Sequence, residues 1–238
     1  FSLNHQIKDL QKEILNLKNK FPEKKIFLMG ESMGGAIVVS LANQNKTLPI
    51  EGVVLVAPAI WNFTEENFFK SKTMKFISKL LPNLKIEGKN WVKVKASDNQ
   101  DMLKELSEDK FFIHKPSLSS LYGIIQLMDE SYSNAYEYFS NASYETLILV
   151  PIKDEIVPRK PLIKLFETLI NSKKLDNKIN LMVFENSYHM MLRDINGAII
   201  SSEIVNWISR KNKNKFLDTS SYGIEILKKS DYHHFLEK

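Results

Sequence analysis

The stretch "FLMGESMGGAIVV", residues 27–39, decides the fold of this chain. The chain holds only 8 glycines in 238 residues, and three of them lie within this stretch around a single serine. Apolar residues frame the cluster on both sides, which is not typical of a flexible linker. No lysine follows Gly35, as a phosphate-binding loop would require. We therefore expect the backbone to turn tightly here, with Ser32 at the turn.

Ser32 is the centre of a Gly-x-Ser-x-Gly pattern that separates a strand-like run from a helix-like run. In such a turn the serine takes a strained conformation, and side chains at Gly30 and Gly34 are expected to collide with neighbouring backbone. The serine hydroxyl is then exposed at the positive end of a helix. The Met33 N–H points to where a carbonyl oxygen becomes negative. We predict a nucleophile elbow; the alternative is a glycine-rich turn with an incidental serine.

Strand-like and helix-like segments alternate along the chain. Strands are predicted at residues 25–29, 52–57, 146–152 and 179–184, and helices at residues 4–20, 33–44, 161–171 and 197–210. This alternation is typical of an α/β domain with a mainly parallel sheet and helices on both faces.

A long insertion, residues 60–145, separates the second and third predicted strands. It is rich in Phe, Lys and Ser and has the pattern of several short helices, and an insertion of this length is usually functional. We interpret it as a helical cap. The predicted organisation is a core segment with the elbow at 1–60, the cap at 61–145, a second core segment at 146–212 and a C-terminal extension at 213–238.

A serine hydroxyl needs a general base, and the base needs an acid that orients it. After a nucleophile elbow these partners follow in the order acid, then histidine. Asp154, in "LVPIKDEIVP", follows the third predicted strand, and His189, in "FENSYHMMLRD", follows the fourth. We predict Ser32 as nucleophile, Asp154 as acid and His189 as base; the alternative for His189 is a histidine of the core.

The other histidines fit this role less well. His5 precedes the serine on an amphipathic helix and is expected to be solvated, and His114 lies in the insertion. His233 and His234 lie in the C-terminal tail, where a metal site with Asp231 has little support.

Two further acidic residues lie near the predicted triad residues in the sequence. Glu155 is adjacent to Asp154 but is expected to point elsewhere. Asp194 follows the histidine, which breaks the order, and it is expected to cap the last helix.

Several segments together resemble the monoacylglycerol lipase and lysophospholipase group of α/β-hydrolases. The matching strings are "FLMGESMGGAIVV", "VLVAPAI", "PIKDEIVP" and "YHMMLRD", and in the cap "LPNLKI" and "LSEDKFFIHKPSLSSLYGIIQL". The resemblance extends over residues 1–212. Many members carry His where Glu31 stands and others carry Glu. The resemblance implies an α/β-hydrolase fold with Ser32, Asp154 and His189 as the triad.

The chain departs from this family at its start. In the family, the helix similar to residues 4–20 follows about four strands, and a His-Gly loop among them supplies the second oxyanion N–H. None of these strands lies in the 238 residues. A bare apolar sheet edge promotes aggregation. We therefore expect an N-terminal part of the same protein to complete the sheet, since losing one oxyanion donor costs roughly 10²–10³ in rate.

The resemblance implies hydrolysis of the carboxylic ester of a single-acyl-chain glycerolipid, monoacylglycerol or lysophospholipid, through an acyl-serine. Neither a metal nor an organic cofactor is needed. The alternatives are a short-chain carboxylesterase or an acyltransferase on the same scaffold, and a non-catalytic α/β-hydrolase-like binding protein. The intact set of Ser, Asp and His argues against the last.

One predicted cap helix, residues 66–81, is both amphipathic and basic. One face holds Phe69, Thr73, Phe76, Ile77 and Leu80, and other faces hold Lys70, Lys75 and Lys79. Such a helix can lie on a membrane surface and collect lipid. The alternative is that its apolar face packs on the protein core.

Composition limits the remaining possibilities. The hydrophobic content of 43% suits a globular protein, and no run approaches the ~18 apolar residues that span a bilayer. The chain has no cysteine, which excludes disulfides and thiol nucleophiles. The net charge of +5 comes from scattered lysines, so a nucleic-acid partner has little support. The sequence predicts a soluble protein and leaves open whether it is cytoplasmic or peripheral to membranes.

Overall fold

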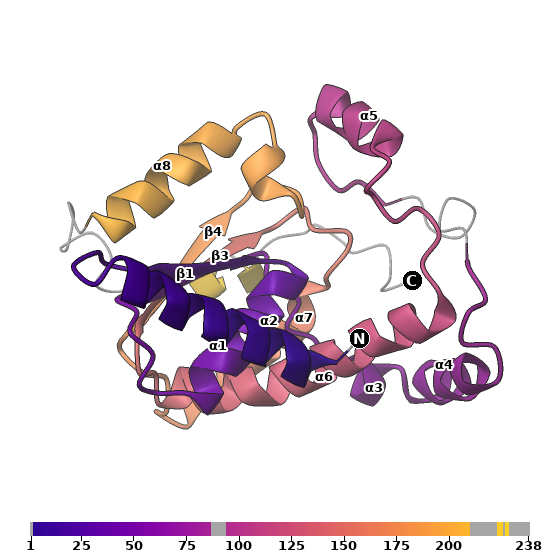
Figure 1. Ribbon diagram of the computed structural model, residues 1–238, viewed down its shortest axis with the longest axis horizontal. Helices are drawn as coiled ribbons and strands as arrows, with labels where there is room; N and C mark the ends of the chain where they lie inside the picture. Colours follow the sequence, from indigo (N-terminus) through magenta and orange to yellow (C-terminus); the bar gives the residue numbers. More distant parts are fainter. Residues whose placement is uncertain (1, 87–93, 210–222, 226, 229–238) are drawn as a thin grey trace.

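The structure, a computed structural model, describes residues 2–86, 94–209, 223–225 and 227–228. Its sheet contains β1 (Phe27–Glu31), β2 (Gly52–Val56), β3 (Glu145–Pro151) and β4 (Ile179–Phe184) in that spatial order. All three strand pairs are parallel. The carboxyl ends of the strands therefore meet at one edge of the sheet, and the segments that follow them lie close together (Figure 1).

The two central strands explain why their sequences are continuous apolar runs. Every residue of β2 is buried, and so is every residue of β3 after Glu145. Parallel strands that are covered on both faces have this pattern. In the described part of the sheet β1 and β4 are the edge strands, and Met29 of β1 is 52% exposed.

The first strand begins and ends two residues later than predicted. The predicted strand ends at Met29 because glycine follows. In the structure, however, Gly30 pairs with Leu55 and Glu31 with Val56, so the ladder continues to the residue before Ser32. Glycine has a backbone donor and acceptor like any other residue, so it does not interrupt the ladder.

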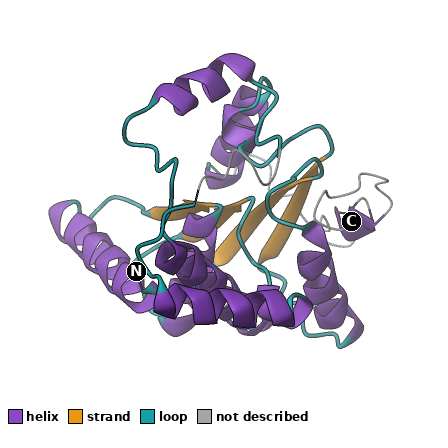
Figure 2. Ribbon diagram, turned by 90° about the vertical axis from the view of Figure 1, so that its right-hand side faces the viewer, coloured by secondary structure: helices purple, strands orange, loops and turns teal. Residues whose placement is uncertain are grey.

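Helices cover both faces of the sheet (Figures 1 and 2). On one face lie α1 (Leu3–Lys20), α2 (Met33–Gln44) and α7 (Arg159–Asn171), whose buried side chains belong to the larger apolar core. The opposite face is covered by α8 (Gly197–Ile208) and the short 3₁₀ helix η2 (Met191–Arg193), around the smaller core. The chain therefore has the predicted layered α/β architecture.

The insertion between β2 and β3 is helical where it is described. It contains α3 (Phe63–Glu66), α4 (Phe68–Leu80), α5 (Gln100–Glu108) and α6 (Leu118–Ser140). The first three lie away from the sheet, whereas α6 runs back along α2 and shares the larger core (Figure 1). The side chains of Asn99 and Ser117 cap α5 and α6 by accepting backbone N–H groups.

In the described part of the chain, every helix is too short or too polar to cross a bilayer. Most of the predicted C-terminal extension, including His233, His234 and Asp231, lies outside the described residues.

Candidate active site

Ser32 occupies the turn between β1 and α2 in a strained backbone conformation. Its φ is 53° and its ψ is −118°, a region that residues with a side chain rarely adopt. Surrounding hydrogen bonds hold this conformation: the Ser32 N–H donates to the Val56 carbonyl (2.9 Å), and the Ser32 carbonyl accepts from Ala59 N–H (2.9 Å). The turn has the strand-to-helix geometry that a nucleophile elbow requires.

The glycines around Ser32 are not equivalent. A Cβ atom on Gly30 would lie 2.4 Å from the Gly34 carbonyl oxygen, and one on Gly35 would lie 2.8 Å from Cβ of Pro58. Both approaches are shorter than real contacts allow. Apart from its chain neighbours and the backbone of its own helix, a Cβ on Gly34 would meet no described atom within 4 Å. The predicted collision is therefore correct at Gly30 and wrong at Gly34, and Gly35 is the second position where close packing requires glycine.

The structure brings Ser32, His189 and Asp154 into one chain of hydrogen bonds. His189 Nε2 lies 2.8 Å from Ser32 Oγ, and His189 Nδ1 lies 2.7 Å from Asp154 Oδ2. His189 is 5% exposed and Asp154 is 7% exposed. With Nδ1–H donating to the carboxylate, Nε2 is left as the acceptor for the serine hydroxyl proton. This is the geometry of a nucleophile, a general base and an orienting acid.

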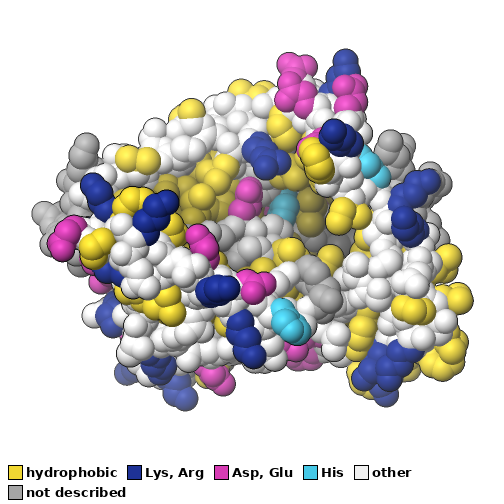
Figure 3. Space-filling model, viewed as in Figure 1, with side chains coloured by type: hydrophobic (Ala, Val, Ile, Leu, Met, Phe, Trp, Pro, Cys, Tyr) yellow, Lys and Arg dark blue, Asp and Glu magenta, His cyan; other side chains and the backbone are white. Residues whose placement is uncertain are grey.

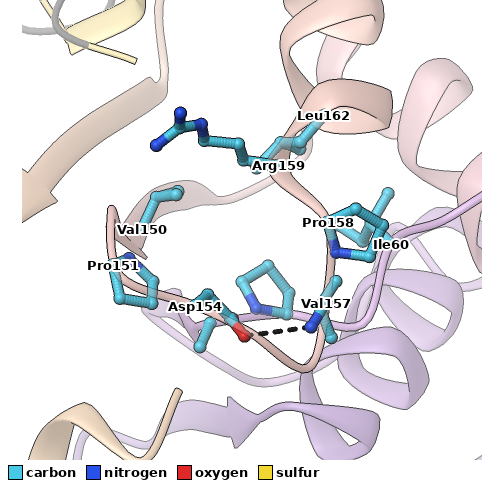
Figure 4. A pocket seen from close by; sticks show the side chains of 10 residues that line it. Ile60, Val150, Pro151, Asp154, Val157, Pro158, Arg159 and Leu162 are labelled. Atoms are coloured by element: carbon cyan, nitrogen blue, oxygen red, sulfur yellow. Dashed lines mark hydrogen bonds between the residues drawn. The ribbon is translucent and has the colours of Figure 1, made fainter. Parts of the chain in front are cut away.

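Backbone donors fix the other oxygen of the Asp154 carboxylate. Asp154 Oδ1 accepts the N–H groups of Ile156 (2.8 Å) and Val157 (2.9 Å). Figure 4 shows the second of these bonds, at the wall of a small pocket whose other lining side chains are mainly apolar. These two bonds hold the carboxylate in place independently of His189, and Oδ2 points to the imidazole ring.

Met33, the predicted oxyanion donor, directly follows Ser32 in the chain. It is the first residue of α2, and the first N–H groups of a helix have no acceptor within the helix. The Met33 N–H is therefore available beside Ser32 Oγ at the positive end of the helix.

Comparison with known proteins agrees with this geometry. A protein family described as "Serine aminopeptidase, S33" matches residues 2–196. The chain belongs to this family. Its fold is the α/β-hydrolase fold, and its family is one of hydrolases.

The relatives include proteins named for lipid hydrolysis. Monoglyceride lipase of Rattus norvegicus is 25% identical over 209 residues, which are 86% of this chain and 65% of the relative. The chain thus spans less than two thirds of the length of this curated relative. Phospholipase YtpA of Bacillus subtilis is 20% identical over 149 residues, covering 63% of this chain and 56% of the relative.

A solved structure extends the likeness to three dimensions. Paleococcus ferrophilus monoacylglycerol lipase superposes with a TM-score of 0.67 at 25% identity, covering 87% of this chain and 75% of the other. These relatives make the chain a monoacylglycerol-lipase-like member of the family.

The structure places the other candidate residues away from the triad. His5 and His114 are exposed, as the sequence analysis expected of His5. Glu155 points elsewhere, as predicted: it is 6% exposed and accepts the Lys95 N–H at 2.7 Å.

The prediction that Asp194 caps the last helix is wrong. The N-cap residue of α8 is Asn196, and its side chain makes no capping bond. The Asp194 carboxylate turns instead toward the loop that carries His189, where it accepts the Tyr188 N–H at 2.8 Å. Sequence reasoning missed this contact because helix caps and loop contacts use the same residue type, and only the backbone path distinguishes them.

Lys95 brings a positive charge close to the His189 loop. Its Nζ donates to the Tyr188 hydroxyl at 3.0 Å and lies 4.4 Å from the centre of the Tyr188 ring. The hydrogen bond to this hydroxyl raises the pKa of Lys95 above its ordinary value. No signal in the sequence could have linked Lys95 to Tyr188, which are far apart along the chain.

Proposed function

We propose that this protein is a serine hydrolase that cleaves the carboxylic ester of a glycerolipid with one acyl chain, a monoacylglycerol or a lysophospholipid. The observation that carries the proposal is the chain of hydrogen bonds from Ser32 through His189 to Asp154, built on a strained strand-to-helix turn. The choice of lipid is supported by relatives that are named monoglyceride lipase and phospholipase.

The reaction follows from the positions of four groups. His189 Nε2 takes the Ser32 proton as Oγ attacks the ester carbonyl, and the Met33 N–H stabilises the negative oxygen. Asp154 holds the imidazole in the correct tautomer and stabilises its charged form. His189 then protonates the leaving glycerol oxygen and afterwards takes a proton from the water that attacks the acyl-serine. Every proton transfer passes through one imidazole.

The proposal is tested by the intact mass of the full-length polypeptide before and after treatment with a fluorophosphonate. We expect one adduct per chain, because His189 removes the Ser32 proton and so activates the hydroxyl. The Ser32→Ala variant is expected to form no adduct. Hydrolysis of monoacylglycerols, lysophospholipids and short-chain esters then gives the substrate profile.

Two results would contradict this function. A folded full-length protein without an adduct would leave the binding-protein alternative. Preferential turnover of short-chain esters would favour the carboxylesterase alternative over the lipid hydrolase.

The cap supports contact with a lipid surface. On α4 the most exposed apolar side chains are Phe69 (83%), Phe76 (65%) and Leu80 (63%), whereas Ser71 and Ser78 are buried. The apolar face predicted from the sequence is therefore exposed in the described chain, which supports membrane contact over the alternative that this face packs on the core. The inner side of α4 also holds Met74, which packs on the larger core, so the helix is anchored while its aromatic residues face outward. An amphipathic helix with exposed aromatic residues is suited to a membrane interface.

The positive charge of α4 favours binding to a negatively charged lipid surface. The helix contains four lysines and no acidic residue. Figure 3 shows apolar and basic side chains together at the lower right, where Figure 1 draws α4. Lysines beside a membrane-inserted face attract anionic headgroups. The occupant that we propose for this face is an anionic lipid bilayer.

The double variant Phe69→Ser, Phe76→Ser is expected to weaken binding to phosphatidylglycerol-containing vesicles at least about tenfold, because two aromatic side chains no longer enter the bilayer. Co-sedimentation with these vesicles and with pure phosphatidylcholine vesicles measures the effect. The matched control is Ile199→Ser, Val205→Ser on α8, where the side chains are 60% and 57% exposed. Equal losses for both variants, or no loss for the first, would exclude α4 as the docking face.

The edge of the sheet at β1 bears on catalysis because Ser32 follows this strand directly. β1 is an edge strand in the described sheet, and Figure 3 shows apolar side chains in a hollow where Figure 1 draws β1 between α1 and α8. The proposed function includes a partner for this edge, strands from an N-terminal part of the same protein, with the second oxyanion donor beside Met33. The chain's 65% coverage of rat monoglyceride lipase is consistent with this.

A further inference from the structure

We propose that Asp194 is a positioning residue for His189, and that it acts by clamping the His189 loop to residues 95–99 of the cap insertion, which we call the cap strap. This inference rests on the proposed hydrolase function. It assigns to the cap insertion the task of supporting the proposed catalytic base.

The carboxylate of Asp194 is buried, and both of its oxygens accept hydrogen bonds. Asp194 is 6% exposed, and its Oδ2 accepts the Tyr188 N–H at 2.8 Å. Its Oδ1 accepts the Ser97 hydroxyl at 2.7 Å and the Asp98 N–H at 3.4 Å. A buried carboxylate needs such donors, because a buried charge without hydrogen-bond partners is strongly destabilising. The donors come from two segments, so the carboxylate holds those segments together.

One of these segments carries the catalytic base. Tyr188 immediately precedes His189, and Met190 immediately follows it. The Tyr188 N–H is held by Asp194, and the Met190 N–H donates to the Ala96 carbonyl of the cap strap at 2.9 Å. The backbone is thus fixed on both sides of His189: on one side directly by the strap, and on the other by Asp194, whose carboxylate the strap binds through Ser97 and Asp98.

The other segment, the cap strap, also reaches the loop of the catalytic acid. Glu155, the neighbour of Asp154, accepts the Lys95 N–H at 2.7 Å. Ser97 is completely buried, so the strap is an internal part of the molecule at this point. The five residues of the strap therefore bind Glu155, the sequence neighbour of Asp154, and both sequence neighbours of His189, Tyr188 and Met190.

Two further bonds secure the strap to the chain beyond His189. The Asn99 side chain donates to the Arg193 carbonyl at 3.2 Å, and the Ile195 N–H donates to Asp98 Oδ1 at 2.8 Å. The strap and the segment that follows His189 are therefore joined by hydrogen bonds along their length. Movement of the cap strap would be transmitted to the base.

The expected consequence is kinetic. His189 Nε2 must stay within hydrogen-bond reach of Ser32 Oγ, now 2.8 Å away, for proton transfer. A displacement of about 1 Å in such a group can cost about 10² in rate. Because Asp194 makes no contact with the serine hydroxyl, its loss is expected to lower kcat and to leave KM nearly unchanged.

The test compares Asp194→Ala, Asp194→Asn and Ser97→Ala in the full-length polypeptide. Asp194→Ala is expected to lower kcat by about 10-fold to 10²-fold, with KM within about twofold. Asp194→Asn is expected to restore most of the rate, because the amide oxygen can accept from Tyr188 and the amide nitrogen can donate to Ser97 Oγ. Ser97→Ala removes one of the bonds to Asp194, together with the bond that Ser97 Oγ accepts from the Asn99 N–H, and leaves the Tyr188 bond in place, so a smaller loss in the same direction is expected.

A matched control distinguishes positioning from general destabilisation. Asp176 also accepts two backbone N–H groups, from Ala142 (3.1 Å) and Lys178 (2.9 Å), but it lies at the amino ends of β3 and β4, away from Ser32. Asp176→Ala is expected to lower the melting temperature without lowering kcat of the folded enzyme. Unchanged kcat in Asp194→Ala, or an equal loss in Asp176→Ala, would overturn the inference.

A readout that needs no turnover separates this inference from the proposed function. The proton on His189 Nδ1, shared with Asp154 across 2.7 Å, gives a downfield NMR resonance. We expect this resonance to shift or broaden in Asp194→Ala and to persist in Asp176→Ala. A wild-type protein without hydrolase activity would refute the proposed function, whereas an unchanged resonance in Asp194→Ala would refute the positioning role.

Discussion

His189→Ala is expected to lower kcat by about 10⁶-fold, which is the scale of loss seen when the base of a serine triad is removed. The imidazole lies 2.8 Å from Ser32 Oγ and is the group placed to take its proton. KM should change little, because His189 is 5% exposed and contributes almost no surface to substrate binding. Steady-state hydrolysis of a monoacyl ester by the full-length protein measures both constants.

The control is the double variant Ser32→Ala, His189→Ala. Residues that act as one unit lose their effect together, so the double variant should be no slower than either single variant. A further large loss in the double variant, or a single-variant loss below about tenfold, would show that Ser32 and His189 do not act together in the reaction.

Asp154→Asn is expected to lower kcat by about 10⁴-fold while leaving the fold intact. The amide is close to isosteric with the carboxylate, but its NH₂ group can face Nδ1 and favour the wrong tautomer of His189. Nε2 would then carry the proton and could not accept another from Ser32. Asp154 Oδ2 lies 2.7 Å from His189 Nδ1, so the substitution acts directly on the tautomer of the imidazole. Single-turnover acylation with an activated ester measures it.

Glu185→Gln is the matched control for this change in charge. Glu185 is exposed on the segment between β4 and His189, and the substitution removes the same charge without touching the triad. Its kcat should equal that of the wild type. If Asp154→Asn and Glu185→Gln were equally active, Asp154 would not be the orienting acid.

The layered fold could be predicted because its elements have strong periodic signals. The apolar run "VVLV" of β2 is buried on both faces, and Ile7 and Ile14 of α1 lie in the core at helical spacing. The predicted bounds of β1 were displaced by two residues because glycine was interpreted as a stop. Local sequence does not show that Gly30 pairs with Leu55, since that depends on the register between distant segments.

The proximity of the three proposed triad residues could be predicted because each of them follows the carboxyl end of a strand. In a parallel sheet, the residues that follow each strand collect at one edge, so Ser32, Asp154 and His189 had to be close if the strands were correctly assigned. Asp194 and the cap strap follow no such rule. Their contacts depend on the path of irregular segments, and neither Ser97 nor Ala96 belongs to a recognisable motif.

The orientation of α4 shows a second limit of sequence reasoning. The spacing of Phe69, Phe76 and Leu80 identifies one helix face, but the same pattern results whether that face lies on the core or on a membrane. Only the tertiary structure shows that Ser71 and Ser78 occupy the inner side. Likewise, Gly34 has the same place in the motif as Gly30, yet only Gly30 is crowded.

The distance along the chain between Ser32 and His189 has a consequence for biosynthesis. They are 157 residues apart, although their side chains are in hydrogen-bond contact. At about 5–20 residues per second, a ribosome needs roughly 10–30 s to make the intervening chain. During that time the elbow serine has been synthesised without its general base. The proposed triad is therefore incomplete in the nascent polypeptide until the segment that carries His189 has been synthesised and has folded against the elbow.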